Sequence, residues 1–201
     1  MAKVCKIILV RHGESVNNKA GIIAGDSPLT DKGREQARLT RKALAGLKFD
    51  VIYSSDLKRA VETAQIIAGK DVPENHQLPG LRERDFGALE GKPEKLHEEE
   101  HEKRVGMSHE ENWVYKHVPD TESDHELSDR FVLALQKLAE NNPGKTILVA
   151  AHGGAIRTTL MKLHELTYHQ VPNGSFKNAG YVELDYANHN FKVVQIVGVH
   201  T

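Results

Sequence analysis

The stretch VCKIILVRHGES, residues 4–15, decides the fold of this chain. Its first half is a run of apolar, mostly β-branched side chains, which predicts a short strand buried on both faces. The strand gives way abruptly to Arg11, His12 and Gly13. Because ligands bind at the carboxyl ends of strands in open α/β sheets, this junction predicts the position of a site as well as a sheet.

A second apolar strand, predicted at residues 146–151, ends in the same way, with His152, Gly153 and Gly154. His12 and His152 are therefore expected on one rim of the sheet. Glycine after each histidine allows close approach of the backbone and leaves amides free to bind an anion. A lone histidine of this kind is about as often a packing residue as a functional one. Two such pairs favour a site.

Helices alternate with these strands. Apolar residues at a helical period predict a helix over residues 31–47, with Thr30 or Asp31 as its N-cap. Further helices are predicted over residues 56–68, 127–141 and 155–166, a strand over 49–53, and a closing hairpin over 180–185 and 191–199. The alternation predicts an α/β fold, a three-layer α/β/α sandwich with a mostly parallel central sheet.

A chain of 201 residues suits a single domain, residues 1–201. Residues 92–129 differ from the rest because they are rich in Glu, His and Lys and poor in aliphatic side chains. We expect them to form an inserted, partly helical flap over the active site. Cys5 is the only cysteine, which excludes an intramolecular disulfide and suggests a small buried hydrophobe.

Charge is almost balanced, with 27 Lys and Arg against 28 Asp and Glu. No overall field attracts nucleic acid or a membrane surface, so an anion must be drawn by a local cluster of cations. The first apolar run is too short for a signal peptide or a membrane span, and we expect a cytoplasmic protein. The last hairpin strand could pair between chains at a sheet edge, which leaves a homodimer open.

Two further segments belong with the histidines. Arg59 falls in the first turn of a helix that follows a strand end, near the same rim. Arg11 and Arg59 together would offer planar forks that suit phosphate oxygens, although an arginine in a helix is usually solvent-exposed. Glu83 lies in a charged segment, residues 81–91, that brings carboxylates close to these cations.

Together these segments resemble the histidine phosphatase superfamily, in the branch that contains cofactor-dependent phosphoglycerate mutase and its phosphatase relatives. The matching pieces follow the family order and span nearly the whole chain. They are Arg11-His12-Gly13-Glu14-Ser15, Ser27-Pro28-Leu29-Thr30 with Gly33, Arg59-Ala60 with Thr63-Ala64, Glu83 with Phe86-Gly87, and His152-Gly153.

The resemblance implies how the reaction proceeds. His12 attacks phosphorus and becomes a phosphohistidine, and Glu83 gives a proton to the leaving group. A neutral imidazole is a nucleophile when its other nitrogen keeps the proton, here expected to be donated to a nearby backbone carbonyl. The same Glu83 carboxylate then activates water.

The resemblance also implies how the phosphoryl group is held. Arg11, Arg59 and His152 bind its oxygens, Asn18 adds a donor, and Gly153 belongs to the same substrate-binding set. Two guanidinium groups and a protonated His152 would supply the positive charge that phosphoryl transfer requires. We therefore expect neither a metal nor a cofactor.

Hydrolysis of small phosphorylated metabolites is favoured over mutase-type phosphoryl transfer, which stays as the alternative. The interval from Glu83 to His152 is shorter than expected of a mutase, and residues 107–111 are acidic where the mutase has paired arginines. Ile22 and Ala24 stand where mutases of this kind place an arginine and a threonine.

Two hypotheses from other functional classes remain, a metalloprotease and a phosphate-binding module. His97 and His101 formally match H-E-x-x-H, the zinc-binding helix of a metalloprotease. The segment is charged all round and no third ligand stands at a recognisable spacing, so a solvated helix is favoured. A phosphate-binding module without turnover is disfavoured, because both His12 and Glu83 are present.

Overall fold

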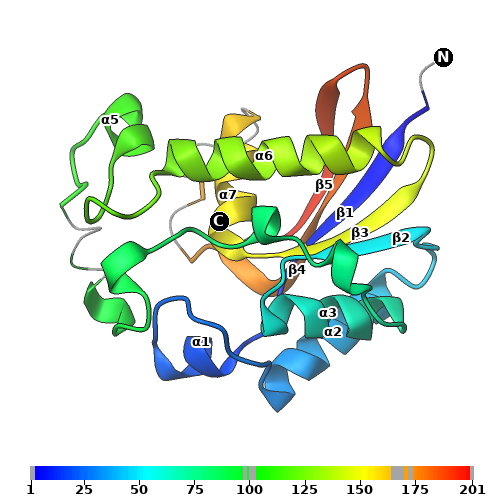
Figure 1. Cartoon of the computed structure of the whole chain (residues 1–201), viewed down its shortest axis with the longest axis horizontal. Helices are drawn as coiled ribbons and strands as arrows, with labels where there is room; N and C mark the ends of the chain where they lie inside the picture. Colours follow the sequence, from blue (N-terminus) through cyan, green and yellow to red (C-terminus); the bar gives the residue numbers. More distant parts are fainter. Residues whose placement is uncertain (1–2, 97–98, 100–102, 164–169, 172–173, 200–201) are drawn as a thin grey trace.

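The computed structural model describes residues 3–96, 99, 103–163, 170–171 and 174–199 (Figure 1). In these residues one sheet has five strands in the order β2-β3-β1-β4-β5. The strands are β1 Cys5–Arg11, β2 Val51–Ser54, β3 Thr146–Ala151, β4 Phe176–Ala187 and β5 Asn190–Val199. Strands β1, β2 and β3 pair in parallel, whereas the β4–β5 hairpin joins by antiparallel pairing, β4 to β1 and β5 to β4. The mostly parallel sheet is thus confirmed only in part.

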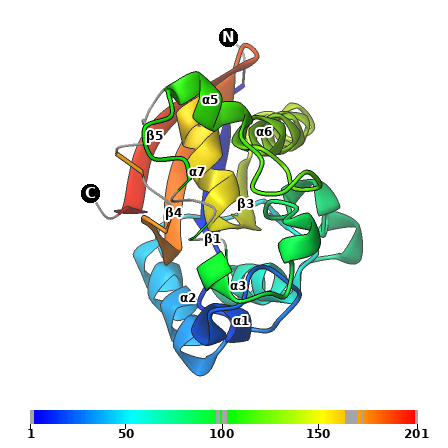
Figure 2. The ribbon, with the colours of Figure 1, turned by 90° about the vertical axis from the view of Figure 1, so that its left-hand side faces the viewer.

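Helices cover both faces of the sheet (Figures 1 and 2). Helices α2 (Asp31–Ala43) and α3 (Lys58–Ala68) lie on one face, and α6 (Asp124–Glu140) and α7 (Gly153–Lys162) on the other. Alternate side chains of β1 divide between the two layers. Ile8 and Val10 join the core with α2 and α3, whereas Ile7 and Leu9 join the core with α6 and α7. Residues of β1 are therefore buried on both faces, and the three-layer sandwich is confirmed.

Cys5 of β1 is buried, as predicted for a small hydrophobe in the first strand. The last strand of the hairpin, β5, forms an edge of the sheet. Its pairing with a second chain stays a prediction. None of the helices in the described part of the chain combines the length and the apolar character that a membrane crossing requires.

Element boundaries differ from the predicted ones where a cap decides them. Thr30 caps α2, accepting a hydrogen bond from the Gly33 amide at 3.0 Å, as predicted. Helix α6 begins at Asp124, earlier than predicted, because Ser123 and Glu126 form a capping box. The last residues of the predicted 92–129 segment therefore belong to α6.

The described residues between Gly91 and α6 lie on the side of the molecule toward which β1 and β3 run (Figure 1). It includes the short helix α5, His109–Val114. Its base is joined to the loop after helix α1 (Val16–Ala20) by backbone hydrogen bonds, from the Ile23 amide to the Lys92 carbonyl and from the Glu94 amide to the Gly21 carbonyl, at 2.8 and 2.7 Å. The base of the segment is thereby fixed to the loop after α1, and its position over the active site stays a prediction.

Candidate active site

His12 and His152 meet at the carboxyl ends of the central strands, as their positions in the sequence predict. Their ring centroids lie 5.1 Å apart, edge to face. The backbone of His12 is bonded to both neighbouring strands, with its amide donating to the Ala151 carbonyl at 2.9 Å and its carbonyl accepting from the Ala179 amide at 3.2 Å. The sheet therefore fixes the position of the ring.

The His12 ring is held in one tautomer. Its Nδ1 lies 2.7 Å from the Gly13 carbonyl, which can only accept, so Nδ1 carries the proton. The Arg59 Nε donates to His12 Nε2 at 3.1 Å. Burial first, and then the charges of Arg59 and Arg11, hold the pKa of His12 well below its ordinary 6.5. The imidazole is neutral at pH 7, with the Nε2 lone pair on the side of the arginines.

Gly13 is required by packing. A Cβ at Gly13 would lie 2.3 Å from the Gly33 carbonyl oxygen in the first turn of α2, which no side chain can accommodate. The Gly13 amide donates to Thr63 Oγ1 at 3.1 Å, and Thr63 donates in turn to the Arg59 carbonyl at 2.6 Å. The prediction of a free amide at Gly13 is therefore wrong, because α3 satisfies it.

Two guanidinium groups flank the histidines, that of the buried Arg59 and that of the partly buried Arg11. Arg59 is 3 % exposed, far from the solvent-exposed position that is usual for an arginine in a helix. It donates to the Gly25 carbonyl as well as to His12. Arg11 donates to the Phe176 carbonyl, and its buried Nε has no hydrogen-bond partner among the described residues. Burial lowers the pKa of both groups, but arginine stays charged at pH 7, so the pair is a centre of positive charge.

His152 is fully buried and is held by a serine. Its Nε2 lies 2.7 Å from Ser55 Oγ, and its buried Nδ1 has no partner within the described part of the chain. Burial first, and then Arg59 and His12, hold its pKa well below 6.5. The expected protonated state is therefore not that of the protein at pH 7. A phosphate dianion against the ring would raise this pKa, because opposite charge favours the protonated form.

The Glu83 side chain lies at the N-terminus of α7, the helix that begins directly after His152. Its carboxylate accepts hydrogen bonds from the amides of Gly154, Ala155 and Arg84, at 2.9, 3.1 and 2.9 Å. A Cβ at Gly154 would lie 2.6 Å from Glu83 Oε1, so glycine is what admits the carboxylate. Gly153 has the corresponding role toward Arg11, whose Nε lies 3.0 Å from an ideal Cβ. The glycines after His152 thus bring Glu83 and Arg11 to the same rim.

Among the predicted site residues, Asn18 has the least direct link to the site. It is an exposed residue of α1, and its Oδ1 accepts from the Ser15 amide at 3.3 Å in a capping box. Its phosphate-binding role stays a prediction. The sequence gives no role to Ser55, and it names Thr63 only within the family resemblance, although both stand in the segment that carries Arg59. The available signal was a pair of serines at the end of a strand.

His97 and His101 lie outside the described residues, so the H-E-x-x-H segment is not placed. Elsewhere, in the residues that are described, no group of three or more His, Cys, Asp or Glu side chains is arranged to hold a metal ion.

Comparison with known proteins decides the family. The model of the histidine phosphatase superfamily, branch 1, matches residues 7–197. The chain belongs to the histidine phosphatase superfamily. The family predicted from the sequence is therefore confirmed, and with it phosphatase chemistry of the histidine phosphatase type.

Relatives with two different activities have the same sequence identity to this histidine phosphatase. It is 34% identical to a metal-independent phosphoserine phosphatase of Arabidopsis thaliana over 166 residues, 81% of this chain and 70% of that protein. It is also 34% identical to a 2,3-bisphosphoglycerate-dependent phosphoglycerate mutase of Parvibaculum lavamentivorans over 177 residues, 82% of each chain. A mutant phosphoserine phosphatase of Entamoeba histolytica, crystallised with phosphoserine, superimposes with a TM-score of 0.78 at 31% identity over 96% of each chain.

Proposed function

We propose that this histidine phosphatase hydrolyses small phosphomonoesters through a phosphohistidine at His12, with phosphoserine as the first substrate to test. One observation carries the proposal. A buried, neutral His12 has its Nδ1 proton bound to a backbone carbonyl and its Nε2 beside the Arg59 guanidinium. A nucleophile and the cation that binds its electrophile are thereby placed together before substrate arrives.

In the first step the Nε2 lone pair of His12 forms a bond to phosphorus as the bond from phosphorus to the ester oxygen breaks. Glu83, which enters the cycle as the carboxylic acid, gives its proton to the departing oxygen, which leaves as the alcohol. In the second step water attacks phosphorus, gives its proton to Glu83 and breaks the N–P bond. The sum is ester plus water to alcohol plus inorganic phosphate, with His12 and Glu83 restored.

The phosphoryl oxygens would be bound by Arg11, Arg59 and His152. Arg11 Nε and His152 Nδ1 are buried nitrogen atoms without a hydrogen-bond partner among the described residues, and both are suited to phosphate oxygens. Asn18 and Gly153 complete the proposed substrate-binding set. These groups supply the positive charge that stabilises the transition state.

The segment from Gly91 to α6 would close over the leaving group. Its base binds the loop of residues 21–25 through the backbone of Gly21 and Ile23, and its part before α5 is anchored where Arg104 binds Asp124. This loop carries Ile22 and Ala24, where a mutase would place polar substrate-binding residues. The apolar loop supports hydrolysis, and phosphoglycerate mutase activity is the alternative.

A panel of phosphomonoesters tests the proposal. We expect release of phosphate from phosphoserine, no need for added metal, and unchanged turnover in EDTA. 3-Phosphoglycerate, with and without the bisphosphate primer, tests the alternative. If the protein interconverted phosphoglycerates faster than it released phosphate, its activity would be that of a mutase and not that of a hydrolase. Turnover that EDTA abolishes and zinc restores would contradict both.

A further inference from the structure

Arg130 of α6 clamps the loop that carries Glu83. Its Nη1 donates to the carbonyls of Gly80 and Arg82 at 3.1 and 3.2 Å, and its Nη2 donates to the Glu83 carbonyl at 3.1 Å. One guanidinium group thus holds the backbone on both sides of the Glu83 side chain. That side chain is fixed separately, by the amides of Gly154, Ala155 and Arg84.

Glu122 holds Arg130 in this orientation. Arg130 Nε donates to Glu122 Oε1 and Arg130 Nη2 to Oε2, both at 2.7 Å. With these bonds all five N–H donors of the guanidinium are used. Glu122 also binds the same loop, accepting from the Asp85 amide and donating its own amide to the Asp85 carbonyl, each at 2.9 Å.

The pair is charged at neutral pH and mostly buried. Burial opposes ionisation of Glu122, but the hydrogen bonds from Arg130 and from the Asp85 amide outweigh it and lower the pKa of the carboxyl. The side chains of Arg130 and Glu122 are 29 % and 20 % exposed, so neither fills the core. The five directed donors explain why position 130 is an arginine, because a lysine offers three donors from a single nitrogen and cannot reproduce the planar fork.

We infer that Arg130 and Glu122 are positioning residues for Glu83, acting on the delivery of the proton to the leaving group and not on the attack of His12. The inference rests on the proposed function, in which Glu83 is the acid. A general acid works only within hydrogen-bond reach of the departing oxygen. A looser loop therefore slows the departure of a poor leaving group while leaving His12, Arg11 and Arg59 in place.

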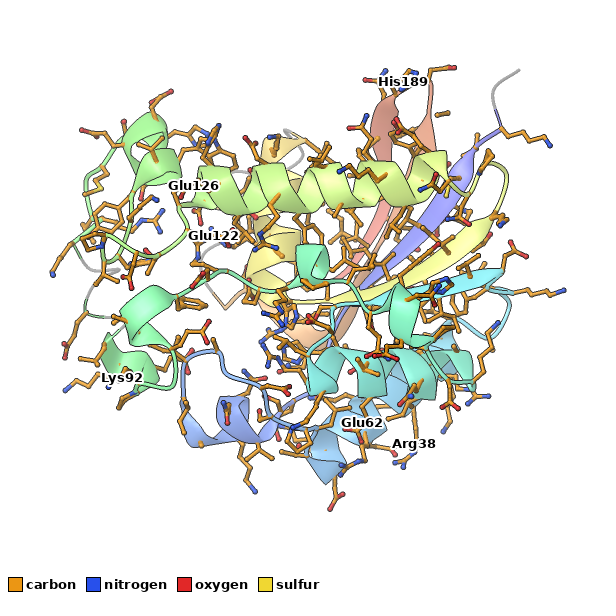
Figure 3. The ribbon with its side chains drawn as sticks, viewed as in Figure 1. Arg38, Glu62, Lys92, Glu122, Glu126 and His189 are labelled. Atoms are coloured by element: carbon orange, nitrogen blue, oxygen red, sulfur yellow. The ribbon has the colours of Figure 1, made fainter. Side chains whose placement is uncertain are left out.

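The test compares two substrates in Arg130→Lys and Glu122→Gln. Phosphoserine has an alkoxide leaving group that needs a proton, whereas p-nitrophenyl phosphate has a leaving group that departs without one. Because Glu83 also serves the second step, which both substrates share, the comparison uses kcat/KM, which reports the step in which the leaving group departs. We expect kcat/KM for phosphoserine to fall roughly 10- to 100-fold and kcat/KM for p-nitrophenyl phosphate to change less than about threefold. Arg38→Lys, an exposed α2 residue on the other side of the sheet, is the matched control (Figure 3). It should leave both substrates unchanged.

Amide hydrogen exchange gives a second measurement that needs no turnover. In Arg130→Lys the amides of Gly154 and Ala155 should exchange faster, because the carboxylate that they bind is less well held. Equal losses of kcat/KM for both substrates, or unchanged exchange, would overturn the inference. If the wild-type protein hydrolysed neither substrate, the proposed function would fail, and the exchange rates alone would decide whether Arg130 holds Glu83.

Discussion

Ser55 Oγ lies 2.7 Å from His152 Nε2, and both side chains are completely buried. Ser55 follows β2 and His152 follows β3, so the bond joins two adjacent strand ends across the rim. The Ser55 amide donates to the Ala150 carbonyl at 2.9 Å, which fixes the serine itself. The bond sets which ring nitrogen of His152 is left for the substrate.

Ser55→Ala should therefore impair catalysis without unfolding the protein. Losing a buried hydrogen-bond partner costs about 1–3 kcal/mol, which corresponds to roughly a 5- to 150-fold loss in kcat/KM. Ser54→Ala is the matched control, because Ser54 Oγ is equally buried and has no partner among the described residues. Steady-state kinetics on both variants checks this, and equal effects would show that Ser55 does not act through His152.

Gly13→Ala should be strongly destabilising. The new Cβ would meet the Gly33 carbonyl oxygen at 2.3 Å. That oxygen belongs to the backbone and the Cβ is attached directly to the backbone, so neither can move aside without displacing the end of β1 from α2. We expect a loss of about 1–3 kcal/mol or more in the free energy of unfolding. Gly46→Ala has open space around it and should be nearly neutral. Urea denaturation measures both; a stable Gly13→Ala would contradict the packing account.

Asp124 is expected to be essential to stability. This carboxylate, 1 % exposed, binds Arg84, Arg104 and Arg157, from the loop of Glu83, the segment before α5, and α7. Asp124→Asn removes the negative charge from a cluster of buried cations, and breaking such an interaction costs about 3–5 kcal/mol. Asp129→Asn, on the exposed face of α6, should cost less than about 1 kcal/mol. Thermal unfolding of the two variants should differ accordingly.

Stability should decline in mild acid because of His12 and His152. Burial holds both pKa values well below 6.5 in the folded protein, whereas the unfolded chain titrates near its ordinary value. Below about pH 6.5 the unfolded state binds more protons, so the free energy of unfolding falls as pH falls. His12→Asn should flatten this dependence in urea titrations between about pH 5 and 7. Identical slopes for the variant and the wild type would show that the buried ring is not the cause.

The elements that carry the site could be predicted because local signals specify them. The apolar run before Arg11 and the one before His152 identify buried strands, and strand ends of one sheet meet at one rim. This placed both histidines correctly. Arg59 followed from its position in the first turn of a helix, and the sandwich followed from the alternation of strands and helices.

What could not be predicted depends on contacts between distant segments. Nothing local shows that Ser55 binds His152, or that Arg130 reaches the carbonyl of Glu83. The neutral state of His152 depends on total burial beside Arg59, and the engaged amide of Gly13 depends on Thr63. The start of α6 is a different case. The capping box of Ser123 and Glu126 is a local sequence pattern, and it indicates a helix that begins at Asp124.

The central claim is that His12 carries the phosphoryl group. Rapid quenching of the protein with 32P-labelled phosphoserine, followed by peptide mapping, tests it most directly. The account predicts label on the peptide that contains His12, stable in base and lost in acid, and absent from His12→Ala, which should also lose turnover. Label on another residue, or phosphatase turnover that survives His12→Ala, would contradict it.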